Sequence, residues 1–369
     1  MEDVVIIGAG VMGCASALAL AERGISALVL ERSVPGAEAS SAAAGILGAQ
    51  VEAHADGPLA RLCLASRERF GKLTSTLQQL TGIDVGYRPC GVTAVGFSPE
   101  DLGRLERETS WQQSAGLPLQ RLDALGAREA EPSLSERVLG GVRFPGDARI
   151  DPPLLLRALR IAAELAGARF HSGSLVRRVL TEGSPRRAVG VVMEDGTRHL
   201  APHVVLAAGS WSALVEGTEL PPSAVRPARG QIVELQVPLP FLRGVVYGPG
   251  CYLSPRDDGR VLVGSTLEFV GFKSGVTAGA VRDLLSAAIS LFPQLAEASV
   301  QRTWSNFRPY TSSELPLLGP SPIEGLVLAT GHYRNGILLS AITGEVVASA
   351  ITGSSSPLDQ LSGLGSSRL

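Results

Sequence analysis

The sequence has few of the features that mark disulfide-rich, metal-binding or nucleic-acid-binding proteins. Its 369 residues include only four cysteines (Cys14, Cys63, Cys90 and Cys251), which are scattered and form no CxxC pair. Neither a disulfide framework nor a metal site is therefore expected. Lys and Arg number 33 against 35 Asp and Glu. This slightly acidic balance argues against a nucleic-acid partner, because such partners select for a basic excess.

Long apolar runs are also missing. The longest candidate, residues 11–30, is interrupted by Glu22 and Arg23, so no membrane span is expected. The chain starts Met1-Glu2-Asp3 rather than with a basic segment, and this favours a cytoplasmic protein. With 45% apolar and 18% charged residues the composition is that of a folded globular chain, and the length predicts two or three domains.

Two kinds of strand pattern alternate along the chain. Continuous apolar runs, typical of parallel strands buried on both faces, occur near the start, the middle and the end. Shorter alternating runs, typical of antiparallel sheet, lie between them. We predict a mixed α/β fold with two interleaved domains. A Rossmann-like nucleotide-binding domain takes residues 1–84, 151–225 and 311–353; an antiparallel-sheet substrate domain takes 85–150 and 226–310; and 354–369 form a flexible tail rich in Ser and Gly.

The sharpest motif lies in the first thirty residues. A strand at 4–7 leads directly into Gly8-Ala9-Gly10-Val11-Met12-Gly13, and a helix, a second strand and Glu31 follow. In such a βαβ unit the glycines permit a tight turn, backbone approach to a pyrophosphate, and close helix–strand packing. An acid at the position of Glu31 accepts the ribose hydroxyls and disfavours a 2′-phosphate, so FAD or NAD is predicted rather than NADP. The plain alternative is a Gly-rich turn beside a surface glutamate.

Six further segments follow the βαβ motif along the chain: 40–47 (SSAAAGIL), 204–211 (VVLAAGSW), 252–256 (YLSPR), 306–309 (NFRP), 316–319 (PLLG) and 331–339 (GHYRNGILL). With these segments in family order, the whole chain resembles the D-amino acid oxidase family of FAD flavoproteins, and within it the glycine oxidases of the thiamine pathway. The resemblance covers almost all of residues 1–350.

This resemblance implies FAD, held without a covalent bond because no cysteine lies in the segments around 308 and 331, where relatives with covalent flavin place one. Small side chains near residue 45 suit a backbone that lies against a flat ring. A helix N-terminus after His332 would stabilise an anionic reduced flavin through its dipole. The implied cofactor residues are Gly8, Gly10, Val11, Met12, Gly13, Glu31, Arg32, Ser40, Ser41, Ala43, Ala44, Gly45, Val176, Gly209, His332, Tyr333, Arg334, Asn335, Gly336, Ile337 and Leu338.

The resemblance also implies a substrate site. Arg308 would clamp a substrate carboxylate with its planar guanidinium fork, and Tyr252 would add a hydroxyl donor. Arg334 would assist through its side chain or by shaping its loop. The plain alternatives are two surface arginines and a half-buried strand tyrosine. No side chain stands out as a general base, so the flavin is expected to carry the chemistry.

The implied activity is oxidative deamination of glycine, sarcosine or a small D-amino acid. Hydride would pass from Cα to flavin N5, the imine would hydrolyse to a 2-oxo acid and ammonia, and molecular oxygen would reoxidise the flavin to give hydrogen peroxide. Gly250 and Leu267 leave the pocket size, and so the substrate, open. Two alternatives remain: a dehydrogenase of the same fold that reduces a quinone or a protein, and a nucleotide-binding protein without catalysis. A homo-oligomer is also left open.

Overall fold

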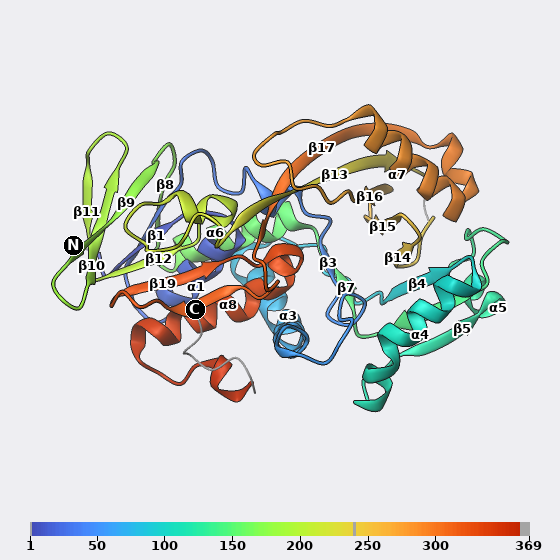
Figure 1. The fold of residues 1–369 in the computed structure, drawn as a ribbon, viewed down its shortest axis with the longest axis horizontal. Coiled ribbons are helices and arrows are strands. Elements are labelled where there is room, and N and C mark those ends of the chain that lie inside the picture. Colours follow the sequence, from blue (N-terminus) through green and yellow to red (C-terminus); the bar gives the residue numbers. More distant parts are fainter. Residues whose placement is uncertain (1, 239–240, 362–369) are drawn as a thin grey trace.

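A six-stranded, mostly parallel sheet forms the centre of one half of the molecule (Figure 1). The computed structural model describes residues 2–238 and 241–361. The strand order is β18-β19-β12-β1-β2-β8, and every neighbouring pair is parallel except β18 with β19. The strands are β1 (Val4–Ile7), β2 (Ala27–Leu30), β8 (Arg169–His171), β12 (His203–Leu206), β18 (Leu317–Pro320) and β19 (Leu326–Thr330).

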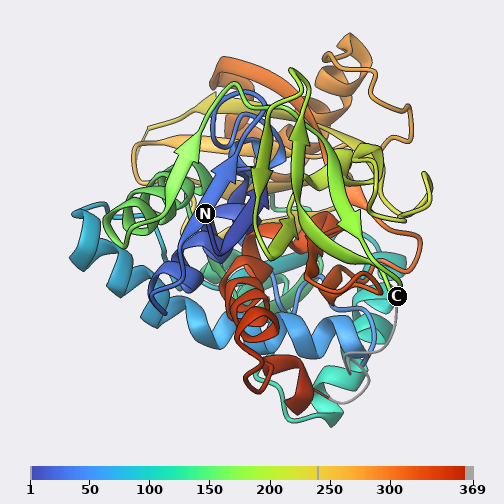
Figure 2. The same ribbon diagram turned by 90° about the vertical axis from the view of Figure 1, so that its left-hand side faces the viewer.

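The two faces of this sheet are covered by different kinds of element. Side chains alternate along a strand, so Val4 and Ile6 of β1 enter a core shared with helices, whereas Val5 and Ile7 enter a second core. That second core is closed by a three-stranded antiparallel sheet, which stands in front of the parallel sheet in Figure 2. Its strands are β9 (Val176–Glu182), β10 (Arg187–Met193) and β11 (Arg198–Leu200).

The helical face consists of α1 (Val11–Ala21), α3 (Pro58–Thr81), α6 (Pro152–Leu165) and α8 (Gly336–Thr352). Helices α1 and α8 approach closely because Gly344 has no side chain. A Cβ at this position would lie 2.6 Å from the carbonyl oxygen of Ala15. By length and composition alone, residues 333–352 would pass as a membrane-spanning segment, but 61% of their apolar window is buried inside the protein. The apolar character of α8 is therefore that of a core helix, packed against α1 and α3.

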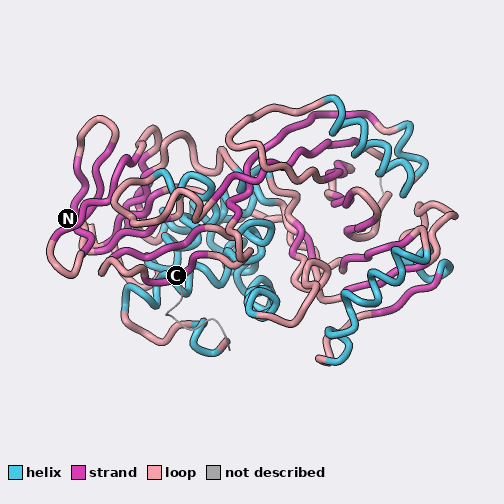
Figure 3. Tube along the Cα trace, viewed as in Figure 1, coloured by secondary structure: helices cyan, strands magenta, loops and turns pink. Residues whose placement is uncertain are grey.

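An eight-stranded sheet, antiparallel except where β4 meets β14, forms the other half of the molecule in the order β17-β13-β16-β15-β14-β4-β6-β5. Figure 3 shows helices α7 (Ala278–Leu291) and α4 (Pro99–Ser114) at opposite ends of it. The strands are β4 (Val92–Gly96), β5 (Gln120–Asp123), β6 (Gly140–Phe144), β13 (Arg226–Gln236), β14 (Val245–Gly248), β15 (Cys251–Pro255), β16 (Arg260–Gly264) and β17 (Ser299–Tyr310).

Short elements connect the two halves. Strands β3 and β7 pair with each other and join the region after the first βαβ unit to the start of α6. The short elements are α2 (Ala39–Ala42), β3 (Ile46–Leu47), α5 (Ala124–Ala130), β7 (Ala148–Arg149), and the 3₁₀ helices η1 (Gly209–Leu214), η2 (Pro293–Glu297), η3 (Tyr333–Asn335) and η4 (Pro357–Gln360).

The mixed α/β fold class predicted from the sequence is confirmed. All strands of the parallel sheet fall in the segments assigned to the FAD-binding domain, and all strands of the eight-stranded sheet fall in the segments assigned to the substrate-binding domain. The domain boundaries themselves stay a prediction. One part of the expected flexible tail differs: residues 357–360 form η4, because Leu358 is buried in the helical core and Ser356 and Asp359 cap the turn. Residues 362–369 lie outside the described residues.

Candidate active site

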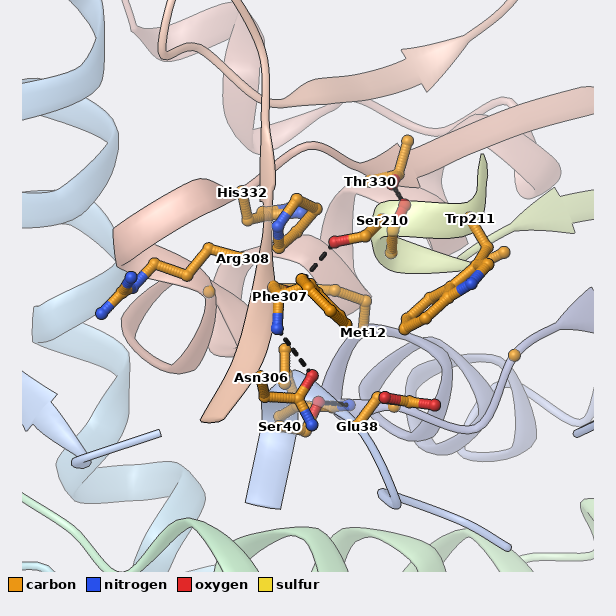
Figure 4. A pocket seen from close by; sticks show the side chains of 18 of the residues that line it. Met12, Glu38, Ser40, Ser210, Trp211, Asn306, Phe307, Arg308, Thr330 and His332 are labelled. Carbon is orange, nitrogen blue, oxygen red and sulfur yellow. Dashed lines mark hydrogen bonds between the residues drawn. The ribbon is translucent and has the colours of Figure 1, made fainter. Parts of the chain in front are cut away.

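A cavity of about 590 Å³ lies where the carboxyl ends of β1, β2, β12 and β19 meet strands β13 and β17. Ligands in open α/β sheets bind at this edge, because the loops after parallel strands converge there. Figure 4 shows Arg308 on one side of the cavity, with Trp211 and Glu38 on the other. The cavity therefore joins the nucleotide end of the parallel sheet to the wall supplied by the larger sheet.

The glycine loop after β1 has the close contacts that its motif requires. Gly8 has a φ of +100°, and a Cβ there would lie 2.7 Å from the carbonyl oxygen of Ala207. A Cβ on Gly13 would lie only 1.9 Å from the carbonyl oxygen of Gly8. Helix α1 thus begins directly against the loop, and Val11 and Met12 of its first turn line the cavity, an arrangement suited to a pyrophosphate.

Glu31, at the end of β2, braces this loop. Its carboxylate accepts the N–H of Ala9 and the N–H of Ser33, each at 2.9 Å. Each oxygen keeps a lone pair that can accept a ribose hydroxyl. Beside it, Arg32 forms an ion pair with Glu38 and lies 3.8 Å from the centre of the Trp211 ring.

The N-terminal end of α8 closes another side of the cavity. Tyr333 has a φ of +47°, and the short η3 turn brings Gly336 and Ile337 to the cavity wall. His332 is buried, and its Nε2 atom lies 3.0 Å from the Thr343 hydroxyl. Burial lowers the pKa of His332 to about 3, so its ring is neutral at physiological pH.

Arg308 and Tyr252 line the end of the cavity formed by the larger sheet. The guanidinium of Arg308 donates to the Ser265 hydroxyl at 2.5 Å and to the carbonyl oxygen of Thr266 at 3.2 Å. Among the residues that the structure describes, Arg308 has no carboxylate partner. It lies over Gly230, where a Cβ would come within 2.3 Å of its Nη1 atom. A half-buried cation held only by neutral groups is a natural site for a carboxylate.

Arg334 also lines the cavity, but its charge is already paired. Its Nε and Nη2 atoms donate to the two carboxylate oxygens of Glu52, at 3.1 and 3.2 Å, and the Tyr247 hydroxyl donates to Glu52 at 2.7 Å. Burial opposes ionisation of Glu52, but the Arg334 guanidinium and these hydrogen bonds outweigh it and lower the pKa of the carboxyl. The Glu52 carboxylate in turn raises the pKa of Arg334. Both groups are therefore charged.

The structure brings most of the predicted site residues together. Arg308, Arg334 and Tyr252 line the cavity, and so do the predicted cofactor residues Gly8, Gly10, Val11, Met12, Glu31, Arg32, Ser40, Ala43, Ala44, Gly45, Val176, Gly209, His332, Tyr333, Gly336 and Ile337. Gly13, Ser41, Asn335 and Leu338 do not belong to its lining. Gly13 packs on Gly8, and Leu338 is 1% exposed in the helical core. Contact of these four residues with the cofactor stays a prediction.

Several lining residues were not foreseen. Glu52, Tyr247 and Ser265 surround the arginines, while Glu38 and Trp211 flank Arg32. Trp211 ends the VVLAAGSW segment already noted, so position in that motif was a usable signal. Glu52 carries no local signal, because its partner Arg334 is 282 residues away in the sequence.

The donor set fits FAD. The glycine loop, Glu31 and the start of α8 surround one continuous cavity, and its wall near residues 43–45 is made of two alanines and a glycine. A Cβ on Gly45 would lie 2.0 Å from the carbonyl oxygen of Ile150, so the backbone of Gly45 packs directly against that of Ile150 and leaves no room for a side chain. No cysteine is found among the described residues that line the cavity.

Comparison with known proteins gives the same result. Residues 3–350 match the family model "DAO: FAD dependent oxidoreductase". The bifunctional protein ThiO/ThiG of Trichormus variabilis is 39% identical over 95% of this chain, which spans about half (52%) of that relative's length. The glycine oxidase of Geobacillus kaustophilus is 37% identical over 95% of this chain and 92% of its own. The crystal structure of glycine oxidase from Geobacillus kaustophilus superimposes with a TM-score of 0.93, at 36% identity, covering 100% of this chain and 99% of that one.

With a family match across almost the whole chain and a cavity whose walls fit the cofactor, the protein belongs to the DAO family of FAD-dependent oxidoreductases.

Proposed function

We propose that the chain is an oxidase that deaminates glycine, or a similarly small amino acid such as sarcosine or a small D-amino acid. With molecular oxygen and water as co-substrates, the products are the 2-oxo acid, hydrogen peroxide and ammonia, or methylamine in place of ammonia when the substrate is sarcosine. The observation that carries this proposal is Arg308, a half-buried cation on the same cavity as the dinucleotide loop, with no carboxylate partner among the described residues. Relatives named glycine oxidase support it.

In this proposal the chain supplies binding and orientation. The first turn of α1 and the glycine loop hold the pyrophosphate, Glu31 accepts the ribose hydroxyls, and the start of α8 lies against the flavin. Val176 contacts the adenine, in keeping with its place in the cavity wall. When bound, FAD supplies the two-electron oxidation of the substrate C–N bond. We further propose that it is held without a covalent bond.

Arg308 binds the substrate carboxylate with its guanidinium fork, and the Tyr252 hydroxyl adds a donor. Tyr252 is 9% exposed and its ring packs 5.6 Å from that of Tyr247, so this end of the cavity has an aromatic wall that limits substrate size. Glu52 does not serve as a base, because its oxygens already accept from Arg334 and Tyr247. The chain's contribution is to hold Cα in place.

Anaerobic reduction of the bound flavin tests the proposal. Glycine, sarcosine, D-alanine and L-alanine are mixed with the purified yellow protein, and bleaching of the flavin absorbance is followed. Glycine or sarcosine should bleach it fastest, and hydrogen peroxide should appear when air is admitted. Bleaching without peroxide would instead favour a dehydrogenase with another acceptor. No bleaching by any amino acid would overturn the proposal. Flavin that stays on the chain after acid denaturation would contradict non-covalent binding.

A cytoplasmic location is part of the same proposal. It agrees with the burial of 61% of the apolar window of residues 333–352 inside the protein. Fractionation of cells that express the full chain with a terminal tag tests it, since recovery in the membrane pellet after a salt wash would contradict it.

A further inference from the structure

Three groups from distant parts of the chain meet at the substrate end of the cavity. Glu52 lies after β3, Tyr247 is in β14, and Arg334 is in η3. The Glu52 carboxylate accepts from both of the others, and its side chain is 16% exposed. All three line the cavity. The result is an ion pair at the cavity wall, in which the Glu52 carboxylate is largely buried and the Arg334 side chain is 38% exposed.

The segment that carries Glu52 is fixed on both sides. Asp147, whose side chain is fully buried, accepts the N–H groups of Gln50 and Val51 at 2.9 to 3.1 Å. The Trp111 indole N–H donates to the carbonyl oxygen of Ala53 at 3.2 Å. Long surface side chains lose much of an ion pair's benefit to their own mobility. For Glu52 this loss is smaller, because its backbone is held and its carboxylate is also fixed by the Tyr247 hydroxyl.

The substrate end of the cavity carries a net positive charge. Arg308 and Arg334 contribute two positive charges and Glu52 one negative charge. Because the negative charge of Glu52 neutralises that of Arg334, the net charge of the three groups is +1, and Arg308 is the cation available to a ligand. The charges are close enough to interact, since Arg308 also helps to lower the pKa of Glu52. A ligand with one carboxylate satisfies Arg308, whereas a second carboxylate would meet the Glu52 carboxylate rather than a free cation.

We propose that Glu52 is a specificity-determining residue, which neutralises Arg334 and so restricts the site to amino acids with a single carboxylate. This inference rests on the proposed function, in which Arg308 binds the substrate carboxylate. It predicts that removal of the Glu52 charge converts Arg334 into a second carboxylate site. In this inference the Arg334 guanidinium binds a ligand carboxylate only when the Glu52 carboxylate has been removed.

Binding to the FAD-loaded protein tests this without turnover. Acetate and malonate, which differ by one carboxylate, are titrated while the flavin difference spectrum is recorded. In Glu52→Gln, which keeps size and an acceptor for Tyr247, malonate should bind about tenfold more tightly than in the wild type, while acetate changes by less than about threefold. Glu52→Gln combined with Arg334→Gln should return malonate to within about threefold of the wild type.

Turnover offers a matched substrate pair. Iminodiacetate is sarcosine with a carboxylate on its methyl group. The ratio of kcat/KM for iminodiacetate to that for sarcosine should rise by about tenfold in Glu52→Gln, through KM rather than kcat. Glu345→Gln removes the carboxylate of a part-exposed pair with Arg69 that does not line the cavity, and should leave both measurements unchanged.

The inference would be overturned if, in Glu52→Gln, the malonate affinity and the ratio of kcat/KM for iminodiacetate to that for sarcosine both stay within about twofold of the wild type. If that variant does not fold, Arg334→Gln serves instead. It leaves Glu52 unpaired beside Arg308 and should weaken acetate binding by about tenfold, and the double variant should restore it. Equal weakening in the single and double variants would mean that Arg334 holds the substrate directly, and would also overturn the inference. A wild-type protein that no amino acid reduces would refute the proposed function instead.

Discussion

The hydroxyl oxygen of Ser40 accepts the N–H of Val11 at 2.9 Å. Gly10, which precedes α1, has no side chain to cap the helix, so the cap comes from α2. Ser40→Ala should therefore lower the free energy of unfolding of the apoprotein by about 1 kcal/mol, the usual cost of a lost N-cap. Urea denaturation measures this, with Ser75→Ala, at an exposed position in α3, as the control. No difference between Ser40→Ala and the wild type would mean that water replaces the cap.

Glu31→Gln should weaken FAD binding by about tenfold or more. The amide offers one acceptor oxygen where the carboxylate now serves two backbone N–H groups, and its NH₂ group would face a donor. Fluorescence titration of the apoprotein with FAD gives the Kd. Glu22→Gln, at an exposed position after α1, is the control. An unchanged Kd would show that Glu31 only braces the loop.

Arg308→Ala should cost about two to three orders of magnitude in kcat/KM for glycine, since the substrate carboxylate loses its counter-charge. Arg308→Lys should recover only part, because an ammonium lacks the planar fork. FAD content should stay normal. Ethylamine, which has no carboxylate, provides the comparison: its oxidation should change far less. Equal losses on both compounds would remove Arg308 from the substrate site.

Gly230→Ala should impair the substrate site without unfolding the protein. The new Cβ would meet the flexible end of Arg308 at 2.3 Å, so the guanidinium must move. A displacement of this size should lower kcat/KM for glycine by about tenfold to a hundredfold, with FAD content unchanged. Gly71→Ala in α3, where the new Cβ meets nothing within 4 Å, is the matched control. Normal kinetics for Gly230→Ala would mean that Arg308 is not held at this point during catalysis.

His332 should make the fold sensitive to acid. Its pKa falls from an ordinary 6.5 to about 3 through burial, so below pH 6.5 the unfolded chain takes up a proton that the folded chain refuses. Stability from this group is complete above that pH and is lost at about 1.4 kcal/mol per pH unit as the pH falls toward 3. Between pH 6.5 and about pH 5, the wild type should lose about 2 kcal/mol more than His332→Gln in urea denaturation. Parallel losses in the two proteins would mean that the ring is protonated in the fold.

The sequence was most informative where structure is local. The strand, glycine loop, helix and acid of residues 4–31 follow one another, so spacing alone predicted their arrangement. The strand predicted at residues 4–7 has the bounds of β1 in the structure. Glu52 was missed because its role is set by Arg334 and Tyr247, which only the folded chain brings to it. Leu358 was assigned to a flexible tail because Ser and Gly around it hide a single buried anchor.

The interleaved topology also orders events during synthesis. The cavity wall needs His332, Gly336 and Ile337, which follow β19 near the end of the chain, while the glycine loop lies near its beginning. When the first βαβ unit leaves the ribosome, the segments that complete the cofactor site have not yet been synthesised. The complete site therefore forms only after α8 has been made, and until then the faces of α1 and α3 that α8 covers stay exposed.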